Sequence, residues 1–244
     1  MNNFDLLKYE IRRLMFNKKY FYMLLILCLI TLDTLMRNII RGVYGTAPFS
    51  RWSYSEFIAV TTPFLLIILI FLCISIFNER ENAVKKIIFS TAFPQKKYYF
   101  LKAFSIGIVF IITALIPIII SFIYYKVMFG YTQFTKFIYP IILFLLPPFI
   151  LVLGLSMFLG KINVKLLYFL MPILFFTCVF NFMFPVWVDL CGNNFILDHG
   201  LSLSFSDGVM PYDITTNMIY SRLIFVFIGI ILLLYSAIKS DTMD

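Results

Sequence analysis

Long apolar stretches recur along the chain, and shorter polar segments separate them. Six stretches approach or exceed about 20 residues, the length that a helix rising about 1.5 Å per residue needs to cross about 30 Å of hydrocarbon. They cover residues 20–40, 57–77, 103–125, 137–159, 166–188 and 219–238. The pattern therefore predicts an all-α polytopic membrane protein with six transmembrane helices.

Residues 1–19 differ from these stretches because their apolar positions are spaced rather than continuous. On a helix, one face collects the apolar residues Phe4, Leu7, Ile11, Leu14 and Met15. Lys8, Arg12 and Arg13 lie on other faces, as in a helix that lies in the membrane interface. The sequence thus divides into an interfacial amphipathic helix over residues 1–19 and a single six-span transmembrane domain over residues 20–244.

The most polar interruption lies between the second and third apolar stretches, over residues 78–102. Asn78 can accept a hydrogen bond from a first-turn amide, and Glu81 can reach back to the Asn78 amide, which is a capping box. Pro94 disfavours helix at the preceding residue. The pattern predicts a short surface helix that begins at Asn78 and ends before Pro94. A solvated loop with one helical turn is the alternative interpretation.

Composition agrees with a membrane protein. The 244 residues are 62% hydrophobic and 13% charged, with a mean hydropathy of +0.96, which leaves too little polar surface for a soluble globule. The net charge of +8 comes from basic residues clustered between apolar stretches. Nucleic-acid binding would instead need a basic face on a folded soluble domain, so we expect no nucleic-acid partner.

The basic residues also indicate the orientation in the membrane. One side of a six-span topology receives 14 of the 20 Lys and Arg residues. These are Lys8, Arg12, Arg13, Lys18, Lys19, Arg80, Lys85, Lys86, Lys96, Lys97, Lys102, Lys161, Lys165 and Lys239. The other side receives Arg37, Arg41, Arg51, Lys126, Lys136 and Arg222. By the positive-inside rule, we expect a multi-pass plasma-membrane protein with both termini and the 78–102 segment in the cytoplasm.

The largest external segment in this topology covers residues 189–218 and is rich in glycine and aspartate. Its four aspartates are Asp189, Asp198, Asp207 and Asp213, and its histidine, His199, is interpreted as a loop residue. Two interpretations of the segment remain open. It forms either an acidic surface that receives a cationic substrate or an ordinary solvated loop.

Few polar residues fall inside the predicted spans. Asp33 is the acidic residue well within hydrocarbon, and Arg37 follows at i+4, so the two side chains can pair along one helix. The alternative is that Asp33 lines a transport pathway. Asn181 in the fifth span either binds a neighbouring helix or faces a cavity, and the sequence does not decide between the two.

The sequence contains no recognisable catalytic or metal-binding constellation. His199 has no Cys or Glu at metal-ligand spacing. Gly160 and Lys161 resemble the end of a phosphate loop. However, Leu155 stands where the first glycine belongs, and Ile162 replaces the hydroxyl that would hold magnesium. We therefore expect a chain that is not an enzyme and holds no cofactor of its own.

The 78–102 segment carries a recognisable order of motifs. It reads Glu79-Arg80-Glu81, then Lys85-Lys86-Ile87-Ile88, then Ser90-Thr91, Pro94 and Lys96-Lys97. Together with an amphipathic N-terminal helix and six spans, this order resembles the permease subunits of type-2 ATP-binding-cassette exporters. In that family, the segment after the second span opens a coupling helix that docks in a groove of a separate ATPase subunit.

The resemblance implies both site residues and partners. It assigns ATPase coupling to Glu79, Arg80, Glu81, Lys85, Lys86, Ile87, Ile88 and Pro94. It also implies cytoplasmic ATPase subunits that bind ATP and Mg, and a second permease copy or a related permease in the same membrane. Ala83 departs from the glycine that many members have, and the 189–218 segment departs from their apolar external hairpin.

The expected function is that of the permease of an ATP-driven exporter, working by alternating access in a dimer. The apolar, Phe-rich spans favour a hydrophobic or amphipathic cargo, such as a peptide, drug or lipid. Two alternatives from other classes remain. One is a secondary transporter, which should show internal repeats and several ionisable residues near the midplane. The other is an immunity or sensor protein that binds its target through the external loop.

Overall fold

The computed structural model describes residues 3–39, 50–78, 81, 83–85, 88, 94–180, 184–203 and 212–238. The predicted all-α fold class is confirmed, because these residues form helices and turns and contain no strand. Five of the described helical segments are long and apolar enough to cross a membrane: Lys18–Arg37, Arg51–Ile76, Gln95–Phe129, Phe134–Ile162 and Thr216–Ile238. They give the chain the composition of a multi-pass membrane protein.

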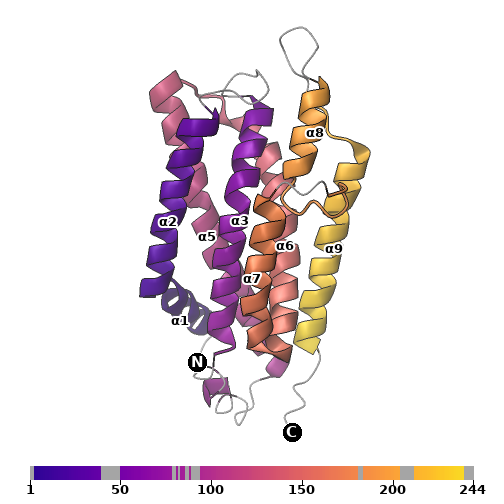
Figure 1. Ribbon diagram of the computed structural model, residues 1–244. Coiled ribbons are helices and arrows are strands. Elements are labelled where there is room, and N and C mark those ends of the chain that lie inside the picture. The colour runs from indigo at the N-terminus through magenta and orange to yellow at the C-terminus, as the bar shows by residue number, and fades with distance from the viewer. Residues whose placement is uncertain are drawn as a thin grey trace.

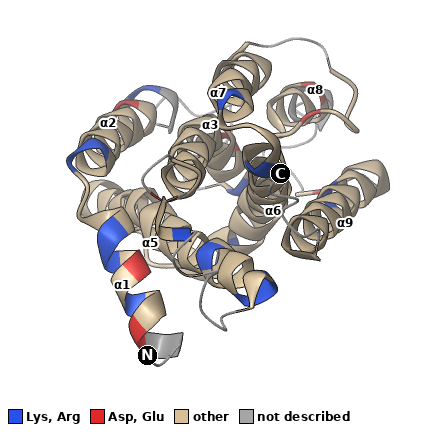
Figure 2. Cartoon of the chain, turned by 90° about the horizontal axis from the view of Figure 1, so that it is seen from below, with Lys and Arg blue, Asp and Glu red and all other residues tan. Residues whose placement is uncertain are grey.

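The long helices stand side by side in one bundle, and the first helix lies across one end of it (Figures 1 and 2). In chain order the helices are α1 (Asn3–Met15), α2 (Lys18–Thr34), α3 (Arg51–Ile76), α5 (Gln95–Phe129), α6 (Ile138–Ile162), α7 (Val164–Val179), α8 (Asn193–Leu203) and α9 (Thr216–Ile238). A π-helical turn, Leu35–Ile39, extends α2, and a 3-10 turn, Phe134–Phe137, precedes α6. We call the end that bears α1 the basal end, and the end that bears α8 the apical end.

Helix α3 occupies the centre of the bundle, with α2, α5, α6 and α7 around it (Figure 2). In the apolar stretch of α3, 78% of the residues are buried, compared with 28% in the stretch that contains α2 and 33% in that of α9. Buried hydroxyls join α3 to its neighbours. The Tyr54 hydroxyl lies 3.0 Å from that of Ser121 on α5, and the Ser55 hydroxyl lies 2.8 Å from that of Tyr212. The outer faces of α2 and α9 remain available to lipid or to another chain.

The predicted fifth span, residues 166–188, is too long. Helix α7 ends at Val179, and its 16 residues cover about 24 Å, less than the hydrocarbon thickness of about 30 Å. Pro185 disfavours helix at the residue before it, which a count of apolar residues ignores. In addition, the Asn193 side-chain amide donates a hydrogen bond to the Cys178 carbonyl. This bond satisfies a carbonyl near the end of α7 and ties α7 to the start of α8.

Helices α6 and α9 meet at a contact that only small residues permit. A Cβ atom added to Gly154 would overlap the Gly229 carbonyl oxygen, and one added to Gly229 would lie 2.5 Å from the Ile150 carbonyl oxygen. Close backbone approach of this kind is a main source of packing energy between membrane helices. The α6–α9 pair therefore depends on these two glycines.

We expect Gly229→Ala to lower the apparent melting temperature of the protein purified in mild detergent, because overpacking typically costs about 1–3 kcal/mol. Gly107→Ala is the matched control, since an added Cβ there would lie 3.8 Å from the Phe149 ring, an ordinary contact. Intrinsic fluorescence during heating provides the measurement. Equal melting temperatures for the two variants would contradict the assigned role of Gly229.

Candidate functional site

A cluster of charged side chains lies buried at the basal end of the bundle. Its four members, which we call the basal ion cluster, are Glu10 and Arg13 of α1, Glu81, and Lys102 of α5. Glu81 belongs to residues 78–94, which connect α3 to α5 and which we call the polar segment. The Lys102 ammonium lies 2.7 Å from the Glu10 carboxylate and 2.9 Å from that of Glu81. The Arg13 guanidinium lies 2.9 Å from Glu10 and also contacts Glu81. Figure 2 shows α1, with its acidic and basic positions, beside the basal end of α5.

The two positive and two negative charges balance, and water hardly reaches them. Lys102 exposes 4% of its side chain, Glu10 10% and Glu81 11%, whereas Arg13 exposes 27%. Each cation contacts both carboxylates, so every member of the cluster meets two opposite charges. The Tyr98 ring lies 5.2 Å from the Lys102 ammonium, and its hydroxyl points toward Glu81 at 3.4 Å. Burial makes these attractions strong and makes an unpaired member costly.

The predicted amphipathic helix is present as α1, but its polar side is not simply solvated. Leu14 packs into the core, while Tyr9 and Phe16 expose 63% and 83% of their surface. Glu10 and Arg13 turn toward the polar segment and α5. Helix α1 therefore supplies two members of the cluster that holds Glu81, while the rings of Tyr9 and Phe16 remain exposed.

The polar segment is described at four of the predicted coupling residues. Glu81 is 8% exposed, and its carboxylate faces α1 and α5 rather than the surroundings of the molecule. The Lys85 ammonium lies 5.3 Å from the Tyr99 ring centroid, and Ile88 packs against the core. Pro94 is the N-cap of α5, so the predicted break at Pro94 is confirmed. Glu79, Arg80, Lys86 and Ile87 lie outside the described residues.

A cavity of about 470 Å³ lies in the apical half, between α2, α3, α7 and α8. Its polar lining comes from Asp33, Thr34, Glu56 and Asn193. Asp33 also lies 2.7 Å from Arg37, which confirms the predicted i,i+4 pair. Both side chains of this pair remain largely exposed, at 58% for Asp33 and 75% for Arg37. Asp33 therefore belongs to an ion pair and to a cavity wall at once.

Glu56 is the cavity residue that the sequence did not reveal, since it stands just before the predicted span over residues 57–77. Its Oε2 atom is shielded from solvent and has no hydrogen-bond partner among the described residues. The described lining contains the carboxylates of Asp33 and Glu56 and no Lys or Arg, and Asp33 already pairs with Arg37. A cationic group is the ligand chemistry that would complement the shielded Glu56 oxygen. Asn181, the other predicted pathway residue, lies outside the described residues.

The expectation that Asp189 belongs to an exposed acidic surface is wrong. Asp189 is 5% exposed, and its carboxylate accepts backbone hydrogen bonds from Gly192 at 2.9 Å and Phe195 at 3.0 Å. Burial raises the pKa of Asp189, and the charge of Arg222 and these hydrogen bonds oppose the rise. Asp198 and Asp213 are exposed, and Asp207 lies outside the described residues.

Two further external residues also differ from their predicted surroundings. Arg222, counted among the external basic residues, is 2% exposed, and its guanidinium donates to the Leu190 carbonyl at 2.6 Å. His199 lies in α8 rather than in a loop, with its ring 5.1 Å from that of Phe195. The described part of the 189–218 segment is therefore anchored to α9 and includes a helix.

No protein-family model, curated protein or solved structure matches the chain. The functional assignment consequently depends on the residues described above and on the motif order in residues 78–102.

Gly192 and Gly130 provide a matched test of the apical structure, since both have positive φ, 83° and 63° respectively. The left-handed backbone costs a non-glycine residue about 1–2 kcal/mol at either position. At Gly192 an added Cβ would also overlap the Phe144 ring, whereas nothing lies within 4 Å at Gly130. We expect Gly192→Ala to lower the apparent melting temperature more than Gly130→Ala does. Equal shifts would show that the Phe144 contact is unimportant.

Proposed function

We propose that this chain is the transmembrane permease subunit of an ATP-driven exporter that moves a hydrophobic or amphipathic cargo, such as a peptide, drug or lipid. The observation that carries the proposal is the basal ion cluster. Through Glu81, the cluster ties the polar segment to α1 and α5, so a force applied to the segment reaches the helices of the bundle. The motif order in residues 78–102 supports the same assignment by its resemblance to type-2 ATP-binding-cassette permeases.

The proposal includes six membrane crossings with both termini in the cytoplasm of the cell. We assign five crossings to the five long helices and the sixth to α7, whose 16 residues are short for a crossing. The start of α1 and the end of α9 both lie at the basal end (Figure 1), as an even number of crossings requires. The excess of Lys and Arg in the connections at this end favours the cytoplasmic side of the plasma membrane.

In this mechanism, two ATPase subunits bind ATP and Mg, close, and push on paired permeases, which are two copies of this chain or this chain with a related one. Val84 is 46% exposed and offers an apolar contact to the ATPase. Glu81 is a positioning residue, because it passes the displacement to Lys102 and Arg13. Direct contacts with the ATPase are assigned to Glu79, Arg80, Lys85, Lys86 and Ile87. Ile88 packs against the core and Pro94 caps α5, so both hold the segment to the bundle.

The apical cavity supports a cargo pathway that includes Asp33. Asp33 lines this cavity and, like its partner Arg37, remains largely exposed, so a second permease that met α2 would enclose the path. The Glu56 carboxylate favours an amphipathic cargo with a cationic group. Asn181 is proposed as a pathway residue because it lies in the connection between α7 and α8, both of which line the cavity.

A secondary transporter is the second candidate, and Glu56 is the observation that favours it. Ionisable residues inside membrane bundles commonly serve proton or ion coupling, and Glu56 places a shielded carboxylate oxygen beside a cavity. Such a carrier would need no ATPase. The immunity or sensor alternative depended on an acidic external loop, and the burial of Asp189 removes one of its four aspartates.

The chain purified from its native membrane in mild detergent should bring down an ATP-binding subunit. We expect Val84→Asp to reduce the recovered subunit about tenfold, which corresponds to about 1.4 kcal/mol of binding free energy, because a charge replaces an apolar contact. Val84 lies outside the basal ion cluster, so the substitution should preserve the fold. Lys8→Asp, which changes an exposed charge on α1, is the matched control.

Quantitative mass spectrometry of the recovered subunits, on protein that elutes as a single folded species, decides between the candidates. If the folded parent protein never recovers an ATP-binding chain, the exporter proposal fails and the secondary transporter remains. If Val84→Asp recovers as much of that chain as Lys8→Asp does, the polar segment is not the docking site.

A further inference from the structure

An apolar groove of about 380 Å³ runs along the membrane-facing side of α5, α6 and α9. On α5 its lining extends from Tyr99 to Ile111, a rise of about 18 Å, close to one leaflet of hydrocarbon at about 15 Å. Phe104 and Ile111, which line the groove, expose 61% and 55% of their surface. Gly107 adds no side chain to the groove wall. The groove therefore has the length and polarity of a single lipid acyl chain.

Lysine side chains stand at the basal mouth of this groove. The Lys161 ammonium donates to the Ser236 carbonyl at 2.9 Å and lies 4.4 Å from the Tyr99 ring centroid, and both Ser236 and Tyr99 line the groove. Lys97 is exposed and precedes Phe100 by three residues, so the two lie on the same face of α5. The positive charge of Lys161 therefore lies at the basal mouth of the groove, where it attracts an anionic headgroup.

The groove helices supply no negative charge to this mouth, since α5, α6 and α9 contain no Asp or Glu. Among the described residues at the basal end, eleven are Lys or Arg and three are acidic. The acidic ones are Asp5, Glu10 and Glu81, and the last two are paired in the basal ion cluster. The described part of the basal end thus carries a surplus of positive charge.

We infer that the groove binds one acyl chain of an anionic phospholipid from the leaflet at the basal end, with the headgroup phosphate held by Lys161 and Lys97. Basic pockets between membrane helices bind anionic headgroups in this way, and each Lys or Arg near the surface contributes attraction for such lipids. A second copy of the chain is a poorer occupant, because it would bring the same lysines against this mouth. The inference depends on the membrane location of the chain and not on the exporter proposal.

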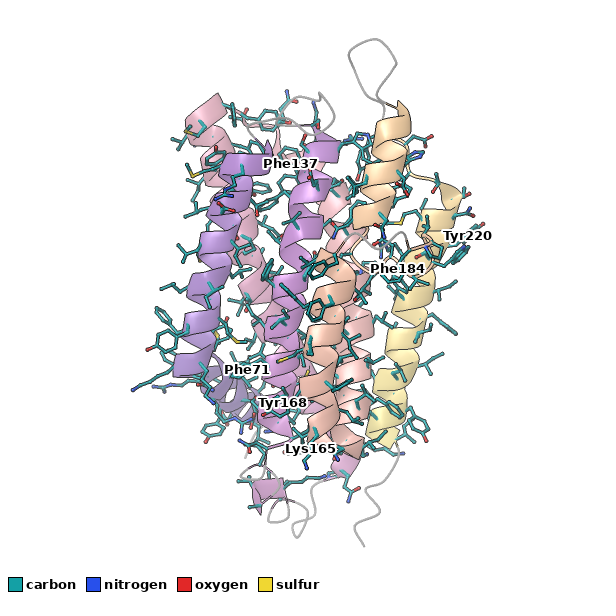
Figure 3. All side chains as sticks on the ribbon, in the orientation of Figure 1. Phe71, Phe137, Lys165, Tyr168, Phe184 and Tyr220 are labelled. Carbon is teal, nitrogen blue, oxygen red and sulfur yellow. The ribbon has the colours of Figure 1, made fainter. Side chains whose placement is uncertain are left out.

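Native mass spectrometry of the delipidated full-length protein tests this site. The probes are phosphatidylglycerol and phosphatidylcholine with identical acyl chains. We expect the parent to prefer phosphatidylglycerol, and Lys97→Gln/Lys161→Gln to lower that affinity on the order of tenfold. Gly107→Leu should weaken binding without removing a charge, because it fills the groove. Lys165→Gln is the control, since Lys165 lies at the basal end of α7 (Figure 3), outside the groove.

Weaker binding of phosphatidylglycerol by both Lys97→Gln/Lys161→Gln and Gly107→Leu, with unchanged binding by Lys165→Gln, supports the site. An equal loss in Lys165→Gln would overturn it, since surface charge alone would then explain binding. Equal affinity of the parent for the two lipids would also overturn it. If Gly107→Leu leaves lipid binding unchanged but converts a dimer to a monomer, the groove is an interface between copies. If that variant does not fold, the lysine pair still decides the outcome.

Discussion

Four ionisable side chains can leave water together only if each one meets an opposite charge, and this constraint organises the basal end of the molecule. Lys102 and Arg13 each contact two carboxylates, which belong to α1 and to the polar segment. Removing one member of such a group would leave a buried charge without its counterpart, which typically costs about 3–5 kcal/mol. The polar segment at Glu81 is therefore held to α1 and α5 as long as the cluster stays intact.

Helix α5 connects this cluster to the rest of the bundle. It begins after Pro94, contributes Lys102 near its basal end, and continues for 35 residues, about 52 Å. Near its apical end, Ser121 is hydrogen-bonded to Tyr54 of the central helix α3. Closely packed elements shift between discrete arrangements rather than deforming continuously. A displacement of Glu81 thus reaches α5 through the ion pair with Lys102, and α5 carries it to the apical half, where the cavity lies. The proposed transporter mechanism depends on this route.

Features that depend on nearby residues could be predicted from the sequence. They include the apolar helices, the amphipathic character of α1, and the break at Pro94. Glu10 and Lys102 stand 92 positions apart, so no local pattern indicates that they meet. The burial of Asp189 and the exposure of Glu56 to a cavity likewise arise from contacts between distant elements, which hydropathy does not contain. The sequence is therefore informative about the elements and much less so about the site between them.

Hydrogen exchange is the most direct test of the claim that the basal ion cluster holds the polar segment. The comparison is between Lys102→Met, which removes the central cation, and Lys96→Met, which removes an exposed cation from the same end of α5. If the cluster holds the segment, the amides around Glu81 and in α1 exchange faster in Lys102→Met alone, and those of α6 and α9 exchange at the parent rate. If folded Lys102→Met protein exchanges at these amides as slowly as Lys96→Met does, the cluster does not hold the segment and the central claim is wrong.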